Sequence, residues 1–147
     1  MSYALTPAAR FHEFRERSGL TPDEAAWRMG ISKANVWDLE TYHDELLSCY
    51  SPSEAARFAK VLGVRTVQFF GSDPEGAPIS LGELHSLIHD QCHRRGLSLD
   101  EFGHLVGWNL KACMDPPDRL LVDMSIDGLT WLCEALGIDW RRVLVGL

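Results

Sequence analysis

The sequence lacks the spaced cysteine pairs that hold structural metal ions or build a disulfide framework. Its four cysteines are Cys49, Cys92, Cys113 and Cys133, and no two of them form a CxxC pair. Three of the four fall inside helical patterns. This usage favours free thiols, most of them buried, in a reducing compartment.

Long apolar runs are also missing. No stretch has the length needed to span a bilayer, and the N-terminal residues lack the apolar core of a signal peptide. We therefore expect a cytoplasmic protein with no membrane partner. Hydrophobic residues make up 46% of the chain, which indicates a folded globular protein and not a disordered one.

The residue patterns of common catalytic sites do not occur. The sequence shows no glycine-rich phosphate loop, no Ser/His/Asp constellation and no paired carboxylates in an evident cleft. His85 and His89 stand four residues apart beside Cys92 and His93, a spacing that could chelate zinc. The HExxH signature is absent, and the alternative is that these imidazoles lie at the interface between the two repeats while Cys92 packs in the core. We expect no enzyme activity, no metal and no cofactor.

Positive charge is scarce throughout the chain, whose net charge is −7. Residues 1–74 carry 8 basic and 10 acidic side chains, a net charge of −2, and residues 75–147 carry 6 and 11, a net charge of −5. Phosphate contacts require clustered Lys and Arg, so only a local basic patch is compatible with nucleic-acid binding. The first half is the better candidate for such a patch.

Helix start and stop signals, by contrast, are frequent. Residues 19–40 are predicted to form two short helices joined by a tight turn. Thr21 and Glu24 predict a capping box at the start of the first helix. Gly30 is expected to end that helix in a left-handed conformation, and Ser32 to cap the second.

The spacing of small and branched residues in this stretch is that of a helix-turn-helix. Ala26 is small where the second helix must cross close to the first, Gly30 follows at the turn, and Val36 fills the angle between the helices. Such a unit carries a helix into the DNA major groove.

The remainder of the first half completes a five-helix unit. We expect a first helix over residues 7–18, an irregular segment over 41–50 with a short turn at 45–47, a fourth helix between Ser51 and Gly63 that opens with a Ser51–Glu54 capping box, and a short fifth helix or turn over 64–71. The proline- and glycine-containing segment 73–79 is predicted to be a linker.

The second half repeats the pattern of the first. Residues 94–108 match residues 17–31 at an offset of 77, and residues 129–144 match residues 55–70 at an offset of 74. Ala26 corresponds to Gly103 in this alignment. The repeat predicts two domains, residues 1–72 and residues 80–147, the second opening with a Ser80–Glu83 capping box.

The first repeat resembles the Xre/Cro-type helix-turn-helix family, which has the fold of the phage lambda repressor DNA-binding domain. The pattern R-x-G-L-T-x-x-E-x-A-x-x-x-G-I-S lies at residues 17–32, and A-x-x-L-G-V lies at residues 59–64. Residues 81–145 resemble the same family more weakly. The resemblance implies an all-α protein of two tandem lambda repressor-like five-helix units, the second degenerate.

Binding of double-stranded DNA by a transcription regulator is the function that this resemblance implies. The Ser32–Glu40 helix would enter the major groove, with base-facing residues Ser32, Lys33, Ala34, Trp37 and Asp38. The candidate contacts to the DNA backbone are Arg15, Arg17, Arg28, Arg57 and Lys60. Alternatively, Arg15 pairs with Glu40 inside the domain.

Three departures from the family pattern support a second interpretation. Pro22 replaces a glutamine that helps to hold a phosphate, Trp37 replaces a small polar residue, and Asp38 would repel phosphate. Trp37 could instead be buried against a partner or the second repeat. The alternative function is a protein-interaction module that keeps the helix-turn-helix fold but has lost DNA binding.

The corresponding helix of the second repeat is interrupted by Asp115, Pro116 and Pro117, because prolines cannot continue a helix. This interruption favours packing, homodimerisation or partner binding as the role of the second repeat.

Overall fold

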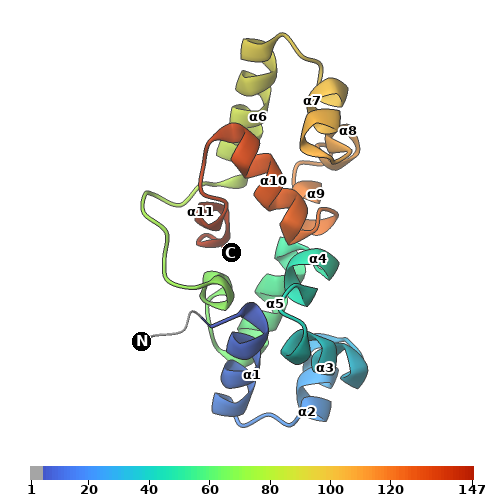
Figure 1. The fold of residues 1–147 in the computed structure, drawn as a ribbon, viewed down its shortest axis with the longest axis vertical. Helices are drawn as coiled ribbons and strands as arrows, with labels where there is room; N and C mark the ends of the chain where they lie inside the picture. Colours follow the sequence, from blue (N-terminus) through green and yellow to red (C-terminus); the bar gives the residue numbers. More distant parts are fainter. Residues whose placement is uncertain (1–4) are drawn as a thin grey trace.

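The computed structural model describes residues 5–147, and all regular secondary structure within them is helical. The predicted all-α class is therefore confirmed. Two bundles of helices follow one another along the longest axis of the molecule (Figure 1). Among the described residues, no helix is both long enough and apolar enough to cross a membrane.

The lower bundle in Figure 1 holds the first half of the chain. Its elements are α1 (Pro7–Arg17), α2 (Pro22–Met29), α3 (Lys33–Thr41), α4 (Glu45–Cys49), α5 (Pro52–Leu62) and the 3₁₀ helix η1 (Thr66–Phe70). The expectation of an irregular segment over residues 41–50 is wrong, because α4 forms within it. Leu46 is buried, and packing against α1 and α3 stabilises a helix too short to form alone.

Two of the predicted capping boxes show how the helix starts are fixed. The Ser51 hydroxyl accepts from the Glu54 amide at 3.2 Å, and the Glu54 carboxylate accepts from the Ser51 amide at 3.1 Å, which confirms that box. The Thr21 hydroxyl likewise accepts from the Glu24 amide, at 3.2 Å, but it also donates to the Glu24 carboxylate at 3.0 Å. Because that carboxylate accepts from the hydroxyl and not from the Thr21 N–H, the prediction of a complete capping box at Thr21 is wrong.

Four phenylalanines form the centre of the first core. Phe11 and Phe58 meet edge to face with ring centroids 6.4 Å apart, and Phe11 stacks on Phe69 at 5.7 Å. Phe14 packs against the same Phe69 ring. Because these rings come from α1, α5 and η1, they join the beginning of the bundle to its end.

The upper bundle holds the second half of the chain. Its elements are α6 (Leu81–Arg95), α7 (Leu99–Val106), α8 (Leu110–Cys113), α9 (Arg119–Val122), α10 (Ile126–Leu136) and α11 (Arg141–Leu144). The Ser80–Glu83 capping box is present. Helix α8 ends before the Pro116–Pro117 pair, since prolines cannot continue a helix, and it is much shorter than α3.

All four cysteines are free, as expected, and three of them are buried. Burial raises the pKa of the Cys133 thiol to about 12, with a smaller contribution from the charge of Asp139. A thiol with so high a pKa is unreactive at neutral pH. Cys49, at the end of α4, is the exposed one.

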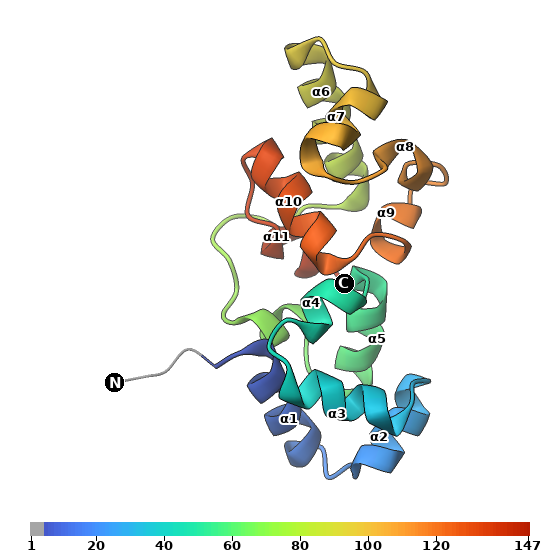
Figure 2. The same cartoon turned by 45° about the vertical axis from the view of Figure 1, so that its right-hand side comes forward.

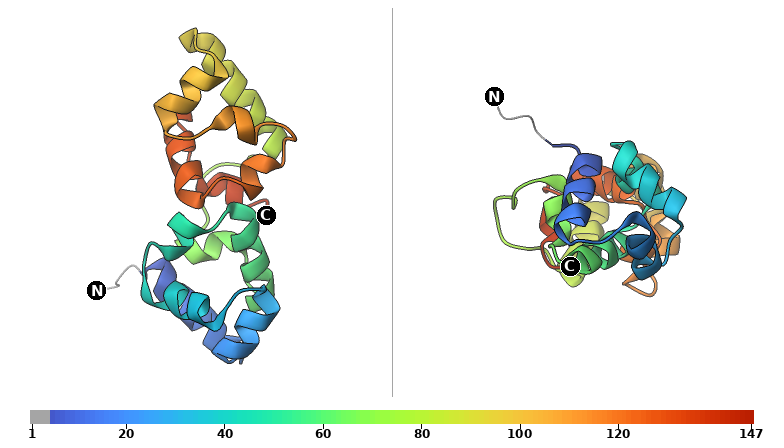
Figure 3. Two further views of the ribbon diagram at one scale, coloured as in Figure 1. Left: turned by 90° about the vertical axis from the view of Figure 1, so that its right-hand side faces the viewer. Right: turned by 90° about the horizontal axis from the view of Figure 1, so that it is seen from below.

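The two bundles contact each other through their C-terminal elements. Helix α4 packs on α10, α5 packs on α9, and η1 packs on α11 (Figures 2 and 3). In chain order, α4, α5 and η1 hold the same places in the first bundle as α9, α10 and α11 hold in the second. The contacts are therefore reciprocal, which is the pattern of a twofold interface.

Specific contacts hold this interface together. The Ile126 amide donates to the Tyr50 carbonyl at 3.0 Å, and the Ser48 hydroxyl donates to the Asp127 carboxylate at 2.7 Å. The rings of Phe70 and Trp140 meet edge to face with centroids 5.1 Å apart. Ile126 is part of the first hydrophobic core, so apolar packing continues across the boundary between the bundles.

Arginines of α11 bind the segment that joins the bundles. Arg142 Nε donates to the Ala77 carbonyl at 2.8 Å, and Arg141 Nη1 donates to the Ser72 carbonyl at 3.2 Å. Residues 71–80 contain no helix. The segment between the bundles is thus attached to the second bundle by hydrogen bonds from side chains to its backbone.

Candidate nucleic-acid interface

Helices α2 and α3 meet at the tight turn that the sequence predicts. Gly30 adopts the left-handed conformation with φ of 72°, which ends α2. The Ser32 hydroxyl then accepts from the Asn35 amide at 3.0 Å and caps α3. Both predictions are confirmed. The first residues of α3 after this turn are exposed.

Buried side chains fix the angle between the two helices. Ala26 and Val36 are both buried at the crossing of α2 and α3, as their spacing predicts. From α5, Arg57 Nε donates to the Met29 carbonyl at 3.1 Å in the last turn of α2. This bond satisfies a carbonyl that would otherwise lack a partner inside the helix and ties α5 to the helix-turn-helix.

The outer face of α3 carries the residues expected to face bases. Ser32, Lys33 and Ala34 are exposed, the Trp37 side chain is 57% exposed, and Asp38 is half-buried. The second bundle packs on α4, α5 and η1 and does not cover this face. The expectation that the second repeat buries Trp37 is therefore wrong.

Two local contacts shape the exposed face. Lys33 Nζ lies 3.6 Å from the Asp23 carboxylate of α2, but both side chains are exposed, so this ion pair is weak and the lysine is free to take another partner. The Trp37 ring meets Tyr42 edge to face with centroids 5.8 Å apart. Tyr42 and Trp27, which is 84% exposed on α2, were not singled out from the sequence. For Trp27 the sequence holds a signal, because the inward-facing residues of α2 are Ala25, Ala26 and Met29, and Trp27 is not among them.

Of the five residues expected to contact the DNA backbone, Arg15 lies inside the domain, so its prediction is wrong. Its side chain is buried, pairs with the Glu40 carboxylate and donates to the Leu20 carbonyl at 2.9 Å. The alternative that Arg15 pairs with Glu40 inside the domain is therefore the correct one. A guanidinium held in this way cannot reach a phosphate.

The other four candidates differ in how free their charges are. Arg28 and Lys60 are exposed and form no ion pair within residues 5–147. Arg17 pairs with Glu13 at 2.8 Å on the surface. Arg57, besides its bond to α2, places its guanidinium 5.4 Å from the centre of the Phe58 ring. Arg28 and Lys60 are thus the most available cations for a phosphate.

Negative charge gathers beyond the C-terminal end of α3. Partial burial and the charge of Glu45 raise the pKa of the Cys49 thiol, with smaller contributions from Asp44 and Asp38. Burial followed by the Glu45 charge also raises the pKa of Tyr50, to about 12. The carboxylates of Asp38, Asp44 and Glu45 thus place negative charge at the C-terminal end of α3, where it would disfavour a phosphate.

The reactivity of the Cys49 thiol provides a measure of this negative charge, because the charge of Glu45 raises the pKa of Cys49. Glu45→Gln removes the charge that disfavours the thiolate, so we expect the pKa of Cys49 to fall and its alkylation at pH 8 to accelerate about twofold or more. The measurement is the rate of maleimide labelling of the folded chain, in which the other three thiols are buried. Glu134→Gln, in the second bundle, is the control and should leave the rate unchanged. An unchanged rate in Glu45→Gln would show that the acidic field is weak.

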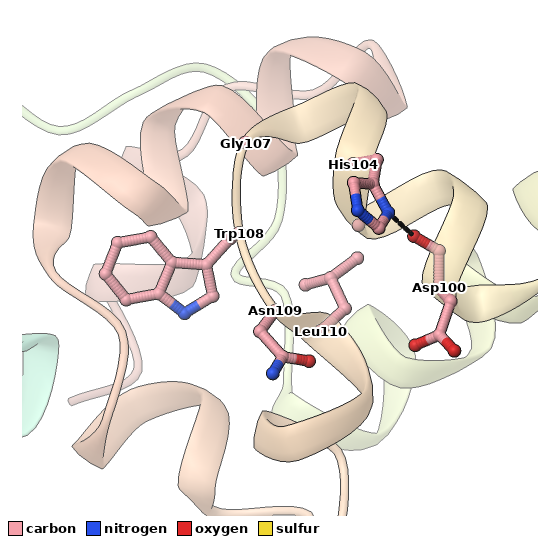
Figure 4. Close-up of a pocket in the computed structure, with 7 residues that line it drawn as sticks. Asp100, His104, Gly107, Trp108, Asn109 and Leu110 are labelled. Atoms are coloured by element: carbon pink, nitrogen blue, oxygen red, sulfur yellow. Dashed lines mark hydrogen bonds between the residues drawn. The ribbon is translucent and has the colours of Figure 1, made fainter.

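The corresponding turn of the second bundle is built differently (Figure 4). Gly103 stands where the first bundle has Ala26, and a Cβ atom there would lie 2.6 Å from the Trp108 carbonyl oxygen. The Asn109 side chain caps α8 by accepting from the Ala112 amide at 3.2 Å. Helix α8 itself spans only four residues. It is too short to present a recognition helix comparable to α3.

The histidines of α6 do not assemble a metal site in the described part of the chain. Within residues 5–147, no group of three or more His, Cys, Asp or Glu side chains is placed to hold a metal ion. The His85 ring nitrogen Nε2 instead lies 3.1 Å from the Pro117 carbonyl oxygen. This contact links α6 to the segment between α8 and α9.

Comparison with known proteins identifies one region of the chain. Residues 8–68 match the family described as "Helix-turn-helix domain", which covers α1 to the middle of η1 and somewhat less than half of the chain. No curated protein and no solved structure matches. The match supports a helix-turn-helix fold for the first bundle.

Proposed function

We propose that the helix-turn-helix domain of residues 8–68 binds double-stranded DNA with sequence specificity and that the chain regulates transcription. The observation that carries this proposal is the exposed face of α3, which the turn at Gly30 presents and the second bundle leaves uncovered. Inserted in the major groove, α3 would face bases with Ser32, Lys33, Ala34, Trp37 and Asp38.

We further propose that the chain is a tandem pair of lambda repressor-like units, residues 1–72 and 80–147, joined by the linker 73–79. The sequence offsets of 77 and 74 and the same order of elements in the two bundles support this interpretation. The helix-capping residues Ser32 and Asn109 occupy corresponding positions at that offset.

Charge restricts how DNA would lie on the domain. Arg28 and Lys33 are the only cations within residues 22–41, against four carboxylates, of which Glu40 is paired with Arg15. The backbone contacts would come from Arg28, and from Arg17, Arg57 and Lys60 on neighbouring helices. Asp38, at the acidic end of α3, could accept only from a cytosine amino group.

Selection of random duplexes by the purified chain, followed by titration, tests the proposal. Lys33→Ala should lower specific affinity by about 1–3 kcal/mol, because lysine is the strong donor to guanine on α3. Arg28→Ala should weaken binding to all sequences alike and reduce the salt slope by about one unit. Asp38→Asn should tighten non-specific binding, since it removes a charge that repels phosphate.

The second bundle supplies a matched control for Lys33. Lys111 of α8 lies 3.8 Å from the Asp100 carboxylate, much as Lys33 pairs with Asp23. Lys111→Ala should leave DNA affinity unchanged. If no sequence is enriched by the selection, or if Lys33→Ala and Lys111→Ala behave alike, α3 is not a DNA-reading helix.

The exposed pair of Trp37 and Tyr42 favours a second candidate function, a protein-interaction module that has lost DNA binding. Exposed aromatic residues are typical anchors of protein interfaces. In this case Trp37→Ala should abolish capture of the partner while helix content, measured by circular dichroism, stays unchanged. If the selection enriches no duplex and Trp37→Ala loses the protein partner, the chain is a protein-interaction module.

A further inference from the structure

A groove lies between α7 and α10 on the second bundle. It is an open, shallow groove with a volume of about 460 Å³, and its lining includes Leu105, Trp131 and Glu134. The two helices are in contact, with α7 at the upper right of the upper bundle and α10 running diagonally across its middle (Figure 1). Leu105 is 58% exposed and Trp131 is 47% exposed. Two large apolar side chains are thus exposed together at the edge of one groove.

The same positions of the first bundle carry positive charge. At the offset of 77, Leu105 corresponds to Arg28. At the offset of 74, Trp131 corresponds to Arg57, and Glu134 corresponds to Lys60. Three candidate phosphate contacts of the first bundle are thus replaced in the second by two apolar residues and a carboxylate. This surface of the second bundle is therefore unsuited to DNA.

The polar groups at the rim of the groove are mainly acceptors. His104 Nδ1 lies 2.8 Å from the Asp100 carbonyl oxygen, which can only accept, so Nδ1 carries the proton and donates (Figure 4). The other ring nitrogen, Nε2, is then an acceptor in the neutral ring. Glu134 adds a carboxylate. Beside the groove, the Arg95 guanidinium donates to the Ala135 carbonyl at 3.3 Å and lies 5.8 Å from the centre of the Phe102 ring.

We propose that this groove binds a helical protein segment with apolar anchor residues flanked by Lys or Arg. The apolar anchors would pack on Leu105 and Trp131, as amphipathic helices do in grooves between helices. The flanking cations would meet Glu134 and the His104 acceptor, within a half of the chain whose net charge is −5. This site does not involve α3, so it stands whether or not the first bundle binds DNA.

Fluorescence anisotropy with a labelled peptide of defined sequence tests the proposal. The probe is a helical peptide of about 15 residues with two leucines four positions apart and lysines on either side. Its control carries glutamates in place of the lysines. We expect the full chain to bind the lysine peptide about tenfold more tightly than the glutamate peptide.

Variants of the groove locate the binding. Trp131→Arg, which restores the residue type of the first bundle, should weaken binding of the lysine peptide about tenfold or more, and Glu134→Lys about fivefold. Trp27→Arg replaces an exposed tryptophan of the first bundle and should leave binding unchanged. If Trp131→Arg lowers the helix content, Leu105→Arg takes its place in the comparison.

Several results would overturn this assignment. They are absence of binding by the lysine peptide, equal binding of the two peptides, and equal binding by the chain and Trp131→Arg. Loss of duplex DNA binding in Trp131→Arg would make the groove a nucleic-acid surface. Lys33→Ala separates the two proposals, because it should weaken DNA binding and leave peptide binding intact.

Discussion

Arg15→Ala is expected to lower the unfolding free energy of the first bundle by about 3 kcal/mol. The Arg15 and Glu40 side chains are only 10% and 12% exposed, and Arg15 also bonds the Leu20 carbonyl. Its removal leaves the Glu40 carboxylate in the domain with His12 Nδ1, 3.4 Å away, as its remaining partner. A carboxylate with so little access to water is strongly destabilising once it has lost its guanidinium partner.

Urea denaturation measures this loss, and Arg17→Ala is the matched control. Arg17 pairs with Glu13 on the surface, where the arginine side chain is 69% exposed, so its truncation should cost less than about 0.5 kcal/mol. Replacing both buried partners, in Arg15→Met with Glu40→Leu, should recover much of the loss. Equal costs for Arg15→Ala and Arg17→Ala would contradict the burial of the Arg15–Glu40 pair.

Gly103→Ala is expected to destabilise the second bundle by about 2 kcal/mol, although alanine is the better helix former by about 1 kcal/mol. The added methyl group would lie 2.6 Å from the Trp108 carbonyl oxygen and 3.3 Å from the Leu110 nitrogen. These are backbone atoms of the turn into α8, and they cannot rotate away. Helices α7 and α8 must therefore separate to accommodate the side chain.

Gly82→Ala, on α6, is the control for this substitution. A Cβ atom at Gly82 would meet only the Ser80 hydroxyl, at 4.0 Å, so the change should be neutral or stabilising by up to about 1 kcal/mol. Chemical denaturation of both variants provides the comparison. If the two alanine variants are equally stable, the close approach of α7 and α8 does not constrain the second bundle.

Local signals predicted the helix-turn-helix well, because its determinants lie within a few residues of each other. A cap at Ser32, a left-handed glycine at Gly30 and inward residues such as Val36 each act over one or two helical turns. Helix α4 was not predicted, because its determinants are not local. Five residues are too few for a periodic pattern, and the helix is stabilised by contacts with distant elements.

The candidate site was less predictable than the fold. The sequence names Arg15 as a cation but does not decide whether it reaches a phosphate, because Glu40, its partner, is 25 positions away. The exposure of Trp37 likewise depends on where the second bundle packs, which is set by Tyr50, Ile126 and their neighbours. Charge and size are local properties of the chain, whereas burial and pairing follow from the tertiary fold.

The reciprocal contact between the bundles has a consequence for concentration dependence. Each bundle is tethered to its counterpart by the short segment 73–79, which gives the pair an effective concentration on the order of millimolar. Dilution therefore does not separate them. The faces formed by α4, α5 and η1 and by α9, α10 and α11 are already occupied by one another. A single chain thus provides the pair of units that two identical chains would otherwise supply by association, so pairing of the two bundles should not depend on protein concentration.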